Sequence, residues 1–240
     1  DSLIEDTHER LSSAGIRAGY VQAGRRADPE APVQVCSLQT LHARGAEARP
    51  PADLVILDEC HRAMSASVRG VLEAYPDAAL LGLTATPQRG DGRPLGDVFA
   101  ELITGPSNRW LTSNGYLVPC EVLAPGGYQD QALVVDPVDA YAKHTPGRRA
   151  IVFAANKTHA TDLAERFRAR GFAADMLVGD TSRQRRRELR AQLRSGELTV
   201  LVGVAVFLEG FDVPEVEVVV LAKAFGVCGA YLQAIGRGLR

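Results

Sequence analysis

The chain has 240 residues, of which 46% are hydrophobic and 23% charged, and its formal net charge is −2 at pH 7. These values predict a globular protein with one large or two small domains, and they argue against a protein that coats nucleic acid through an overall basic field. No apolar run approaches the roughly 20 residues of a membrane span, and no signal peptide precedes the first predicted helix. We therefore expect a cytoplasmic protein without a membrane partner. The four cysteines lack CxxC spacing, so neither a zinc site nor a disulfide framework is predicted.

The first part of the chain alternates helical and strand patterns. A helix is predicted over 3–13, where Gly15 follows as a stop signal. The later elements are strands at 16–21, 33–36, 54–57 and 79–83 and a helix at 67–75. Strands that alternate with helices favour a parallel sheet, and such sheets bind ligands at the carboxyl ends of their strands.

Residues 124–147 contain three prolines and a Gly-Gly pair, which predicts a linker between a first domain at 1–123 and a second at 148–240. The second domain repeats the alternation, with strands at 150–153, 173–177, 200–204 and 216–221 and helices at 157–170, 182–194 and the C-terminus. The predicted fold class is therefore α/β, with two domains built on mainly parallel sheets.

Two adjacent carboxylates, Asp58 and Glu59, directly follow the apolar strand at 54–57. Carboxylates at the end of a buried strand are costly unless they hold a positive group, and in nucleoside triphosphatases that group is a hydrated magnesium ion. We predict that Asp58 holds Mg²⁺ through water and that Glu59 polarises the attacking water. The alternative is a strand that ends in an acidic turn.

Three motifs occur in a fixed order: DECH at 58–61, TAT at 84–86 and QAIGRGLR at 233–240. The set resembles the motifs of superfamily 2 helicases and translocases, the DEAD/DEAH-box-like group, over nearly the whole chain. The resemblance implies two tandem RecA-like domains that bind ATP and Mg²⁺ in the cleft between them.

The resemblance also implies roles around the carboxylates. His61 would couple the two domains, and Thr84 and Thr86 would link hydrolysis to strand movement through hydrogen bonds with the DECH side chains. Without the resemblance, His61 is a local hydrogen-bonding residue and the threonines cap a turn.

Gln233, Arg237 and Arg240 would complete the catalytic site from the second domain, since a planar guanidinium neutralises charge on a γ-phosphoryl group. The two arginines are predicted to share a face of the last helix. The alternative is a solvated basic helix end. The sequence at 209–214 resembles motif V, in which Gly210 permits a tight turn and Asp212 contacts the nucleotide.

Matching positions imply nucleic-acid contacts in both domains. These residues are Ser37, Gln39 and Thr40 in the first domain and Thr181, Ser182 and Arg186 in the second. Small hydroxyl groups and helix amino-termini suit phosphate oxygens rather than bases, so the partner is predicted to be a nucleic-acid backbone, without sequence specificity. For most arginines of the helix at 182–194, a solvated surface is the alternative interpretation.

A phosphate-binding loop needs Gly-Lys followed by Ser or Thr, and none of Lys143, Lys157 and Lys223 stands in such a sequence. We therefore expect a piece of a longer protein, with the first domain truncated at its N-terminus and the second at its C-terminus. Residues 1–240 alone are then expected to be inactive.

These features predict an ATP-dependent helicase or translocase that acts on DNA rather than RNA and is encoded by a bacterium or phage. Two alternatives stay open. One is a motor subunit of a restriction or remodelling complex that translocates without separating strands. The other is a clamp that binds nucleic acid without hydrolysing ATP.

Overall fold

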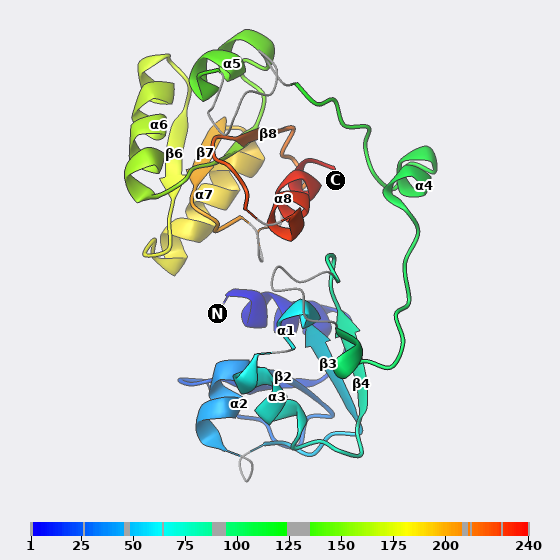
Figure 1. Cartoon of the computed structure of the whole chain (residues 1–240). Helices are drawn as coiled ribbons and strands as arrows, with labels where there is room; N and C mark the ends of the chain where they lie inside the picture. The colour runs from blue at the N-terminus through cyan, green and yellow to red at the C-terminus, as the bar shows by residue number, and fades with distance from the viewer. Residues whose placement is uncertain are drawn as a thin grey trace. The chain divides into compact units, whose positions relative to one another are not determined.

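A computed structural model describes residues 2–25, 27–45, 49–63, 65–87, 95–123, 135–207, 211, 213–226 and 228–239. The chain forms two compact units, Asp1–Ile103 and Thr104–Arg240, whose elements are labelled in Figure 1. No helix among these residues is long and apolar enough to cross a membrane.

The division of the chain lies earlier than the predicted linker at 124–147. Residues 104–123 already belong to the second unit, and helix α5 (Pro137–His144) packs into that unit through Val138 and Tyr141, which are buried. Residues 124–134 of the predicted linker lie outside the described residues. The domain boundaries drawn from the sequence therefore remain a proposal.

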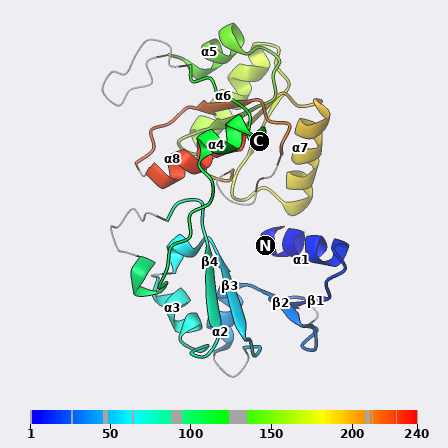
Figure 2. The same cartoon turned by 90° about the vertical axis from the view of Figure 1, so that its right-hand side faces the viewer.

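The first unit contains two pairs of parallel strands. Helix α1 (Ser2–Ser13) precedes β1 (Ala18–Val21), which pairs with β2 (Val33–Cys36), and α2 (Leu38–Arg44) follows. Strand β3 (Leu54–Asp58) pairs with β4 (Ala79–Leu83) so that Asp58 lies opposite Leu83. Figure 2 shows the two strands side by side. Between them come the 3-10 helix η2 (Cys60–Arg62) and α3 (Ala66–Leu72), and η3 (Leu95–Asp97) comes after β4.

The core of the first unit lies on one side of β3 and β4. Leu57 and Cys60 pack there with Val68 of α3 and with Phe99. Side chains alternate between the faces of a strand, so the neighbours of Leu57, including Ile56, are exposed on the other face. The carboxylate-bearing end of β3 is therefore anchored from one side by Leu57 and Cys60.

Gly82 of β4 allows the Phe99 ring and Cys60 to approach the strand. A Cβ atom at Gly82 would lie 2.5 Å from Phe99 Cζ and 2.8 Å from Cys60 Sγ, whereas a Cβ at Gly70, inside α3, would meet nothing within 4 Å. We expect Gly82→Ala to lower the free energy of unfolding by about 1–3 kcal/mol through overpacking. Gly70→Ala, the matched control, should raise it by about 0.5–1 kcal/mol because alanine favours a helix interior. Urea unfolding of both variants checks this, and equal stability of the two would contradict it.

The second unit is built on a four-stranded parallel sheet in the order β6-β7-β5-β8. Its elements are α4 (Asn108–Ser113), α5, β5 (Ala150–Phe153), α6 (Lys157–Ala169), β6 (Ala174–Leu177), α7 (Arg183–Ser195), β7 (Val200–Gly203), β8 (Val218–Leu221), α8 (Cys228–Ile235) and η4 (Gly236–Gly238). The parallel α/β fold predicted from the alternating pattern is confirmed.

Helices cover both faces of this sheet (Figures 1 and 2). Ala150 and Val152 of β5 pack against α5 and α6, while Ile151 and Phe153 pack against α7 and α8. All four side chains are fully buried, which explains the uninterrupted apolar run of a central parallel strand.

The end of the chain differs from the prediction. Helix α8 ends at Ile235, so Arg237 lies in the short 3-10 helix η4 rather than on the last α-helix. Gly236 and Gly238 flank Arg237, and glycine disfavours an α-helix interior by about 1 kcal/mol. Arg240 lies outside the described residues, so the predicted shared face of the two arginines is not part of the described structure.

Candidate functional site

The two predicted catalytic carboxylates lie at the carboxyl end of β3. Asp58 is the last residue of the strand and is exposed, and its Oδ1 accepts a hydrogen bond of 2.9 Å from the backbone N–H of Glu59. Glu59 has the left-handed backbone conformation, with φ 51° and ψ 47°. For a residue other than glycine this conformation costs about 1–2 kcal/mol, and such strained residues cluster at functional sites.

His61 joins the DECH sequence to the TAT sequence. Its Nδ1 lies 3.2 Å from Glu59 Oε2 and 3.2 Å from Thr84 Oγ1. The Thr84 hydroxyl accepts a hydrogen bond from Thr86 N at 3.1 Å and donates one to Thr86 O at 3.2 Å. Because the Thr84 proton is used in this way, the Thr84 hydroxyl accepts the hydrogen bond from His61, whose Nδ1 then carries the proton. The structure thus brings Glu59, His61, Thr84 and Thr86 together.

Cys60 lies between Glu59 and His61 in the sequence and anchors this segment in the core. Its side chain is buried in the core with Leu57, and burial, with the nearby carboxylates of Glu59 and Asp58, raises the pKa of its thiol. Burial also raises the pKa of the Cys36 thiol to about 11. Both thiols are therefore protonated at neutral pH and act as small apolar side chains.

Asp58 has the chemistry required to hold magnesium. Mg²⁺ prefers oxygen ligands, keeps several of its waters and is usually bound by one or two carboxylates together with substrate phosphates. An exposed carboxylate at a strand end leaves room for such a hydrated ion. Glu59, one residue further, is held by His61 at the same strand end.

The predicted arginine site of the second unit lies beside the segment that resembles motif V. Arg237 donates a hydrogen bond of 2.8 Å from Nη1 to the carbonyl of Phe211. Phe211 is buried against Phe207, with ring centroids 4.8 Å apart. Gln233 is half-buried on α8. Gly210 and Asp212 lie outside the described residues, so the backbone of Phe211 is the described link between motif V and the arginine.

The predicted nucleic-acid hydroxyl groups begin helices in both units. Ser37 is the N-cap of α2 and accepts a hydrogen bond from Thr40 N at 3.4 Å. Ser182 is the N-cap of α7 and accepts one from Arg185 N at 3.2 Å. Gln39 is exposed in the first turn of α2. Each serine therefore has a structural use whether or not it contacts phosphate.

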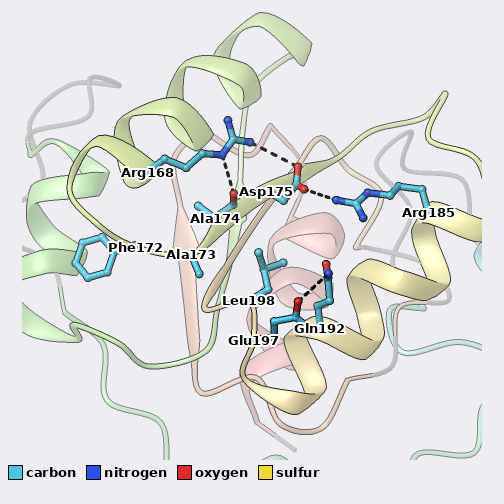
Figure 3. Close-up of a pocket in the computed structure, with 9 residues that line it drawn as sticks. All are labelled: Arg168, Phe172, Ala173, Ala174, Asp175, Arg185, Gln192, Glu197 and Leu198. Carbon is cyan, nitrogen blue, oxygen red and sulfur yellow. Dashed lines mark hydrogen bonds and ion pairs between the residues drawn. The ribbon is translucent and has the colours of Figure 1, made fainter.

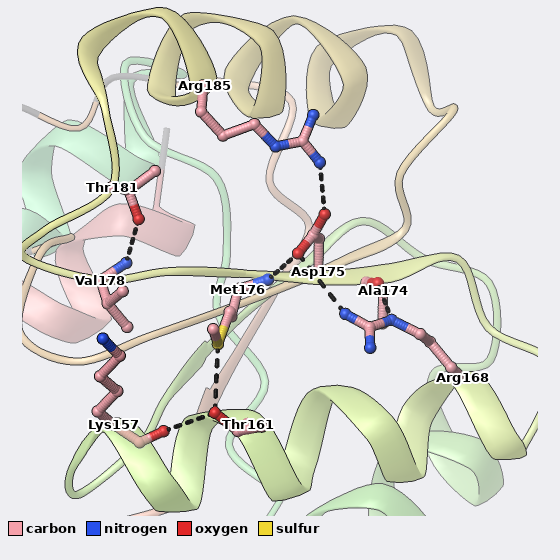
Figure 4. Close-up of polar contacts among 9 residues, drawn as sticks. All are labelled: Lys157, Thr161, Arg168, Ala174, Asp175, Met176, Val178, Thr181 and Arg185. Atoms are coloured by element: carbon pink, nitrogen blue, oxygen red, sulfur yellow. Dashed lines mark hydrogen bonds and ion pairs between the residues drawn. The ribbon is translucent and has the colours of Figure 1, made fainter.

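Arg186 holds the loop that precedes α7. Its Nε donates to Thr181 O at 2.9 Å, and its Nη2 donates to Val178 O and Gly179 O, each at 2.8 Å. The Thr181 hydroxyl accepts a hydrogen bond of 3.0 Å from Val178 N in the same loop (Figure 4). Three carbonyl groups thus engage Nε and Nη2 of the guanidinium, and the direct phosphate contact of Arg186 stays a prediction. We therefore assign Arg186 to positioning the loop that carries Thr181 and Ser182.

An ion-pair network on the edge strand β6 was not predicted from the sequence. Asp175 Oδ2 accepts from Arg185 Nη2 at 2.6 Å, and Asp175 Oδ1 accepts from Met176 N at 2.7 Å. Arg168 Nε donates to Ala174 O at 2.9 Å. Arg168, Asp175 and Arg185 line a pocket of about 290 Å³ (Figure 3). The side chains engage backbone groups that an edge strand would otherwise offer to another strand. Only the pairing of β6 reveals this role, so no local sequence signal could have indicated it.

Two family models match the chain. The model described as "Type III restriction enzyme, res subunit" matches residues 1–89, and the model described as "Helicase conserved C-terminal domain" matches residues 133–240. The 51.5 kDa protein of Lactococcus phage (isolate 7-9) is 30% identical over 207 residues, which cover 78% of this chain and 46% of the relative. The chain thus spans less than half the length of that relative.

Solved structures show the same fold. A fragment structure assigned to an HsdR subunit of a type I restriction enzyme from Vibrio vulnificus YJ016 has a TM-score of 0.70 and 21% identity, covering 98% of this chain and 48% of its own. S. cerevisiae Dbp5 bound to RNA and ADP BeF3 has a TM-score of 0.61 and 20% identity, covering 98% of this chain and 65% of its own. These solved structures share the fold of tandem RecA-like domains. Because the restriction-enzyme subunit model matches in the first unit and the helicase model in the second, and the two together match most of the chain, the chain belongs to the superfamily 2 helicase-like proteins.

Proposed function

We propose that this chain is the motor core of an ATP-dependent helicase or translocase that moves on DNA. The observation that carries the proposal is the contact of His61 with both Glu59 and Thr84 at the carboxyl ends of two paired parallel strands. Ligands of parallel α/β sheets bind at this edge. Because the chain belongs to a helicase family, we assign ATP hydrolysis to these residues.

In the first unit, Glu59 orients the attacking water and accepts its proton. The contact with His61 holds the Glu59 carboxylate at the strand end. Because His61 is also hydrogen-bonded to Thr84, a movement of His61 would shift Thr84 at the end of β4. Asp58 would hold the magnesium ion through water. When bound, that ion neutralises charge on the phosphate oxygens.

In the second unit, Arg237 neutralises charge that develops on the γ-phosphoryl group. A guanidinium fits a phosphate with two parallel hydrogen bonds, and the Phe211 carbonyl holds one side of the Arg237 group. This role requires the two units to act on one nucleotide, with Gln233, Arg240, Gly210 and Asp212 as further contributors. Alternating grip by the N-terminal turns of α2 and α7 on a nucleic-acid backbone would then produce movement.

A second candidate function is translocation without strand separation. The match of residues 1–89 to the model of a restriction-enzyme subunit favours it. The two functions share the ATP site and differ in what the motor does to the duplex ahead of it.

The proposal is tested by measuring ATP hydrolysis of the full-length protein with single-stranded DNA and with RNA of the same sequence. We expect DNA to stimulate hydrolysis more strongly than RNA. Displacement of a labelled strand from a duplex would identify a helicase, whereas displacement of a third strand from a triplex without duplex opening would identify a translocase. Hydrolysis that no nucleic acid stimulates would contradict both.

Residues 1–240 alone should hydrolyse ATP negligibly, because none of their three lysines stands in a Gly-Lys-Ser/Thr loop that cradles the phosphates. The same hydrolysis assay on the purified 240-residue chain checks this. Robust turnover by that chain would show that the phosphates are held in another way.

A further inference from the structure

An exposed pair of stacked aromatic rings stands out in the second unit. Trp110 lies on α4 and Tyr116 follows that helix, and their ring centroids are 5.8 Å apart with an interplanar angle of 12°. Trp110 is 48% exposed and Tyr116 is 69% exposed. Aromatic side chains of this size dominate cores and interfaces, so a stacked pair in solvent calls for a binding partner.

The backbone around the pair is ordered by its own hydrogen bonds. Ser107 is the N-cap of α4, and its hydroxyl accepts a hydrogen bond of 3.2 Å from Trp110 N. After the helix, Gly115 has a φ of 78°, a conformation that glycine adopts readily. Tyr116 N then donates to Leu111 O at 2.9 Å, which turns the chain back toward the helix. The platform is thus formed before any partner binds.

The same segment is joined to the arginine turn. Two residues after Tyr116, the backbone N–H of Val118 donates a hydrogen bond of 3.1 Å to the carbonyl of Leu239. Leu239 directly follows η4, which contains Arg237. A ligand on the aromatic pair would therefore contact a segment that is hydrogen-bonded to the end of the predicted catalytic arginine motif.

The chemistry around the pair indicates the kind of partner. Arg109 is the only charged residue of the stretch 104–120, and the stretch is otherwise made of small polar and apolar residues. An aromatic pair and a cation on one short segment suit single-stranded nucleic acid, because every base has a π-face and every nucleotide carries a phosphate. A second copy of this surface fits less well, since two-fold pairing would bring the Arg109 groups of both copies toward each other.

We propose that Trp110 and Tyr116 form a stacking platform for unpaired bases of the nucleic acid on which the motor moves. The proposal rests on the proposed function and adds a contact to bases beside the contacts to phosphates. Because stacking tolerates any base, the platform would grip the strand without reading its sequence.

Trp110 is the only tryptophan of the chain, so its fluorescence reports directly on the platform. We expect oligodeoxythymidine to quench the emission of the 240-residue chain, with the same concentration dependence as the anisotropy of a labelled oligonucleotide. An abasic oligonucleotide of equal length keeps the phosphates and lacks the bases. It should bind without quenching.

Substitution gives a second, independent measurement. Trp110→Ala is expected to weaken oligodeoxythymidine binding by at least about 5-fold, while the affinity for the abasic strand stays unchanged. Tyr231→Ala, at another exposed aromatic residue of the same unit, is the matched control and should leave both affinities unchanged.

Several results would overturn the proposal. Binding of oligodeoxythymidine without quenching would remove the platform and leave the proposed function intact. Equal quenching by the abasic strand would trace the signal to a rearrangement of the protein rather than to stacking. Quenching that grows with protein concentration alone would identify a second copy as the partner. Absence of binding to either strand would reject the platform together with nucleic-acid binding by this chain.

Discussion

Glu59→Gln in the full-length protein is expected to lower ATP turnover by about 10²–10⁴-fold, the usual contribution of a general base, and to leave ATP binding nearly unchanged. The substitution keeps the size of the side chain and removes its ability to accept a proton. The amide can still accept a hydrogen bond from His61 Nδ1, which lies 3.2 Å from the Glu59 carboxylate. The loss should therefore appear in the rate of hydrolysis and not in the fold.

The measurement combines steady-state hydrolysis with equilibrium binding of a labelled ATP analogue. Glu73→Gln makes the same chemical change at an exposed position just after α3, so it should leave both quantities unchanged. Near wild-type hydrolysis by Glu59→Gln would show that Glu59 is not the base.

Arg237→Ala is expected to lower the hydrolysis rate by about 10³-fold or more and to weaken ATP binding much less. An arginine finger contributes about 10³–10⁵-fold to the rate, and we expect at least the lower value. Charge on the γ-phosphoryl group grows toward the transition state, so a cation that meets this charge acts mainly on the rate. Arg187→Ala, at an exposed position on α7, is the matched control and should leave the rate unchanged. Arg237→Lys tests whether charge alone is enough, since lysine cannot form the two parallel hydrogen bonds of a guanidinium.

Arg186→Ala should behave differently from Arg237→Ala, because its guanidinium holds the carbonyl groups of the loop before α7. We expect weaker nucleic-acid binding with an unchanged basal rate. If Arg186 contacts phosphate directly, its substitution should also reduce the magnitude of the slope of log affinity against log salt by about 1. If Arg186 only positions the loop, its substitution should lower the affinity and leave that slope unchanged.

If Arg237→Ala weakens only nucleic-acid binding, the arginine turn contacts the strand and the assignment of Arg237 to the ATP site is wrong.

The sequence alone indicated the elements on which the site is built. The strands at 33–36, 54–57, 79–83 and 150–153 were visible as short runs rich in apolar residues. Among them, β5 is buried along its whole length, as a central strand of a parallel sheet requires. The helix at 182–194 was also predicted from the sequence, and in the structure Ser182 is its N-cap. The apolar run at 54–57 also placed Asp58 and Glu59 at the end of a strand. The order of the DECH, TAT and QAIGRGLR motifs indicated the family resemblance.

Only the tertiary structure decided which side chains meet. His61 and Thr84 are 23 positions apart, and their contact depends on the register that places Asp58 opposite Leu83. The loop before α7 offers three carbonyl groups to Arg186, a set of contacts that the family resemblance, which singled out Arg186, did not indicate. Local propensity determines where strands and helices form. Pairing and packing between distant segments determine which donor reaches which acceptor, and for that reason the strand ends could be predicted from the sequence whereas the hydrogen bonds that join them could not.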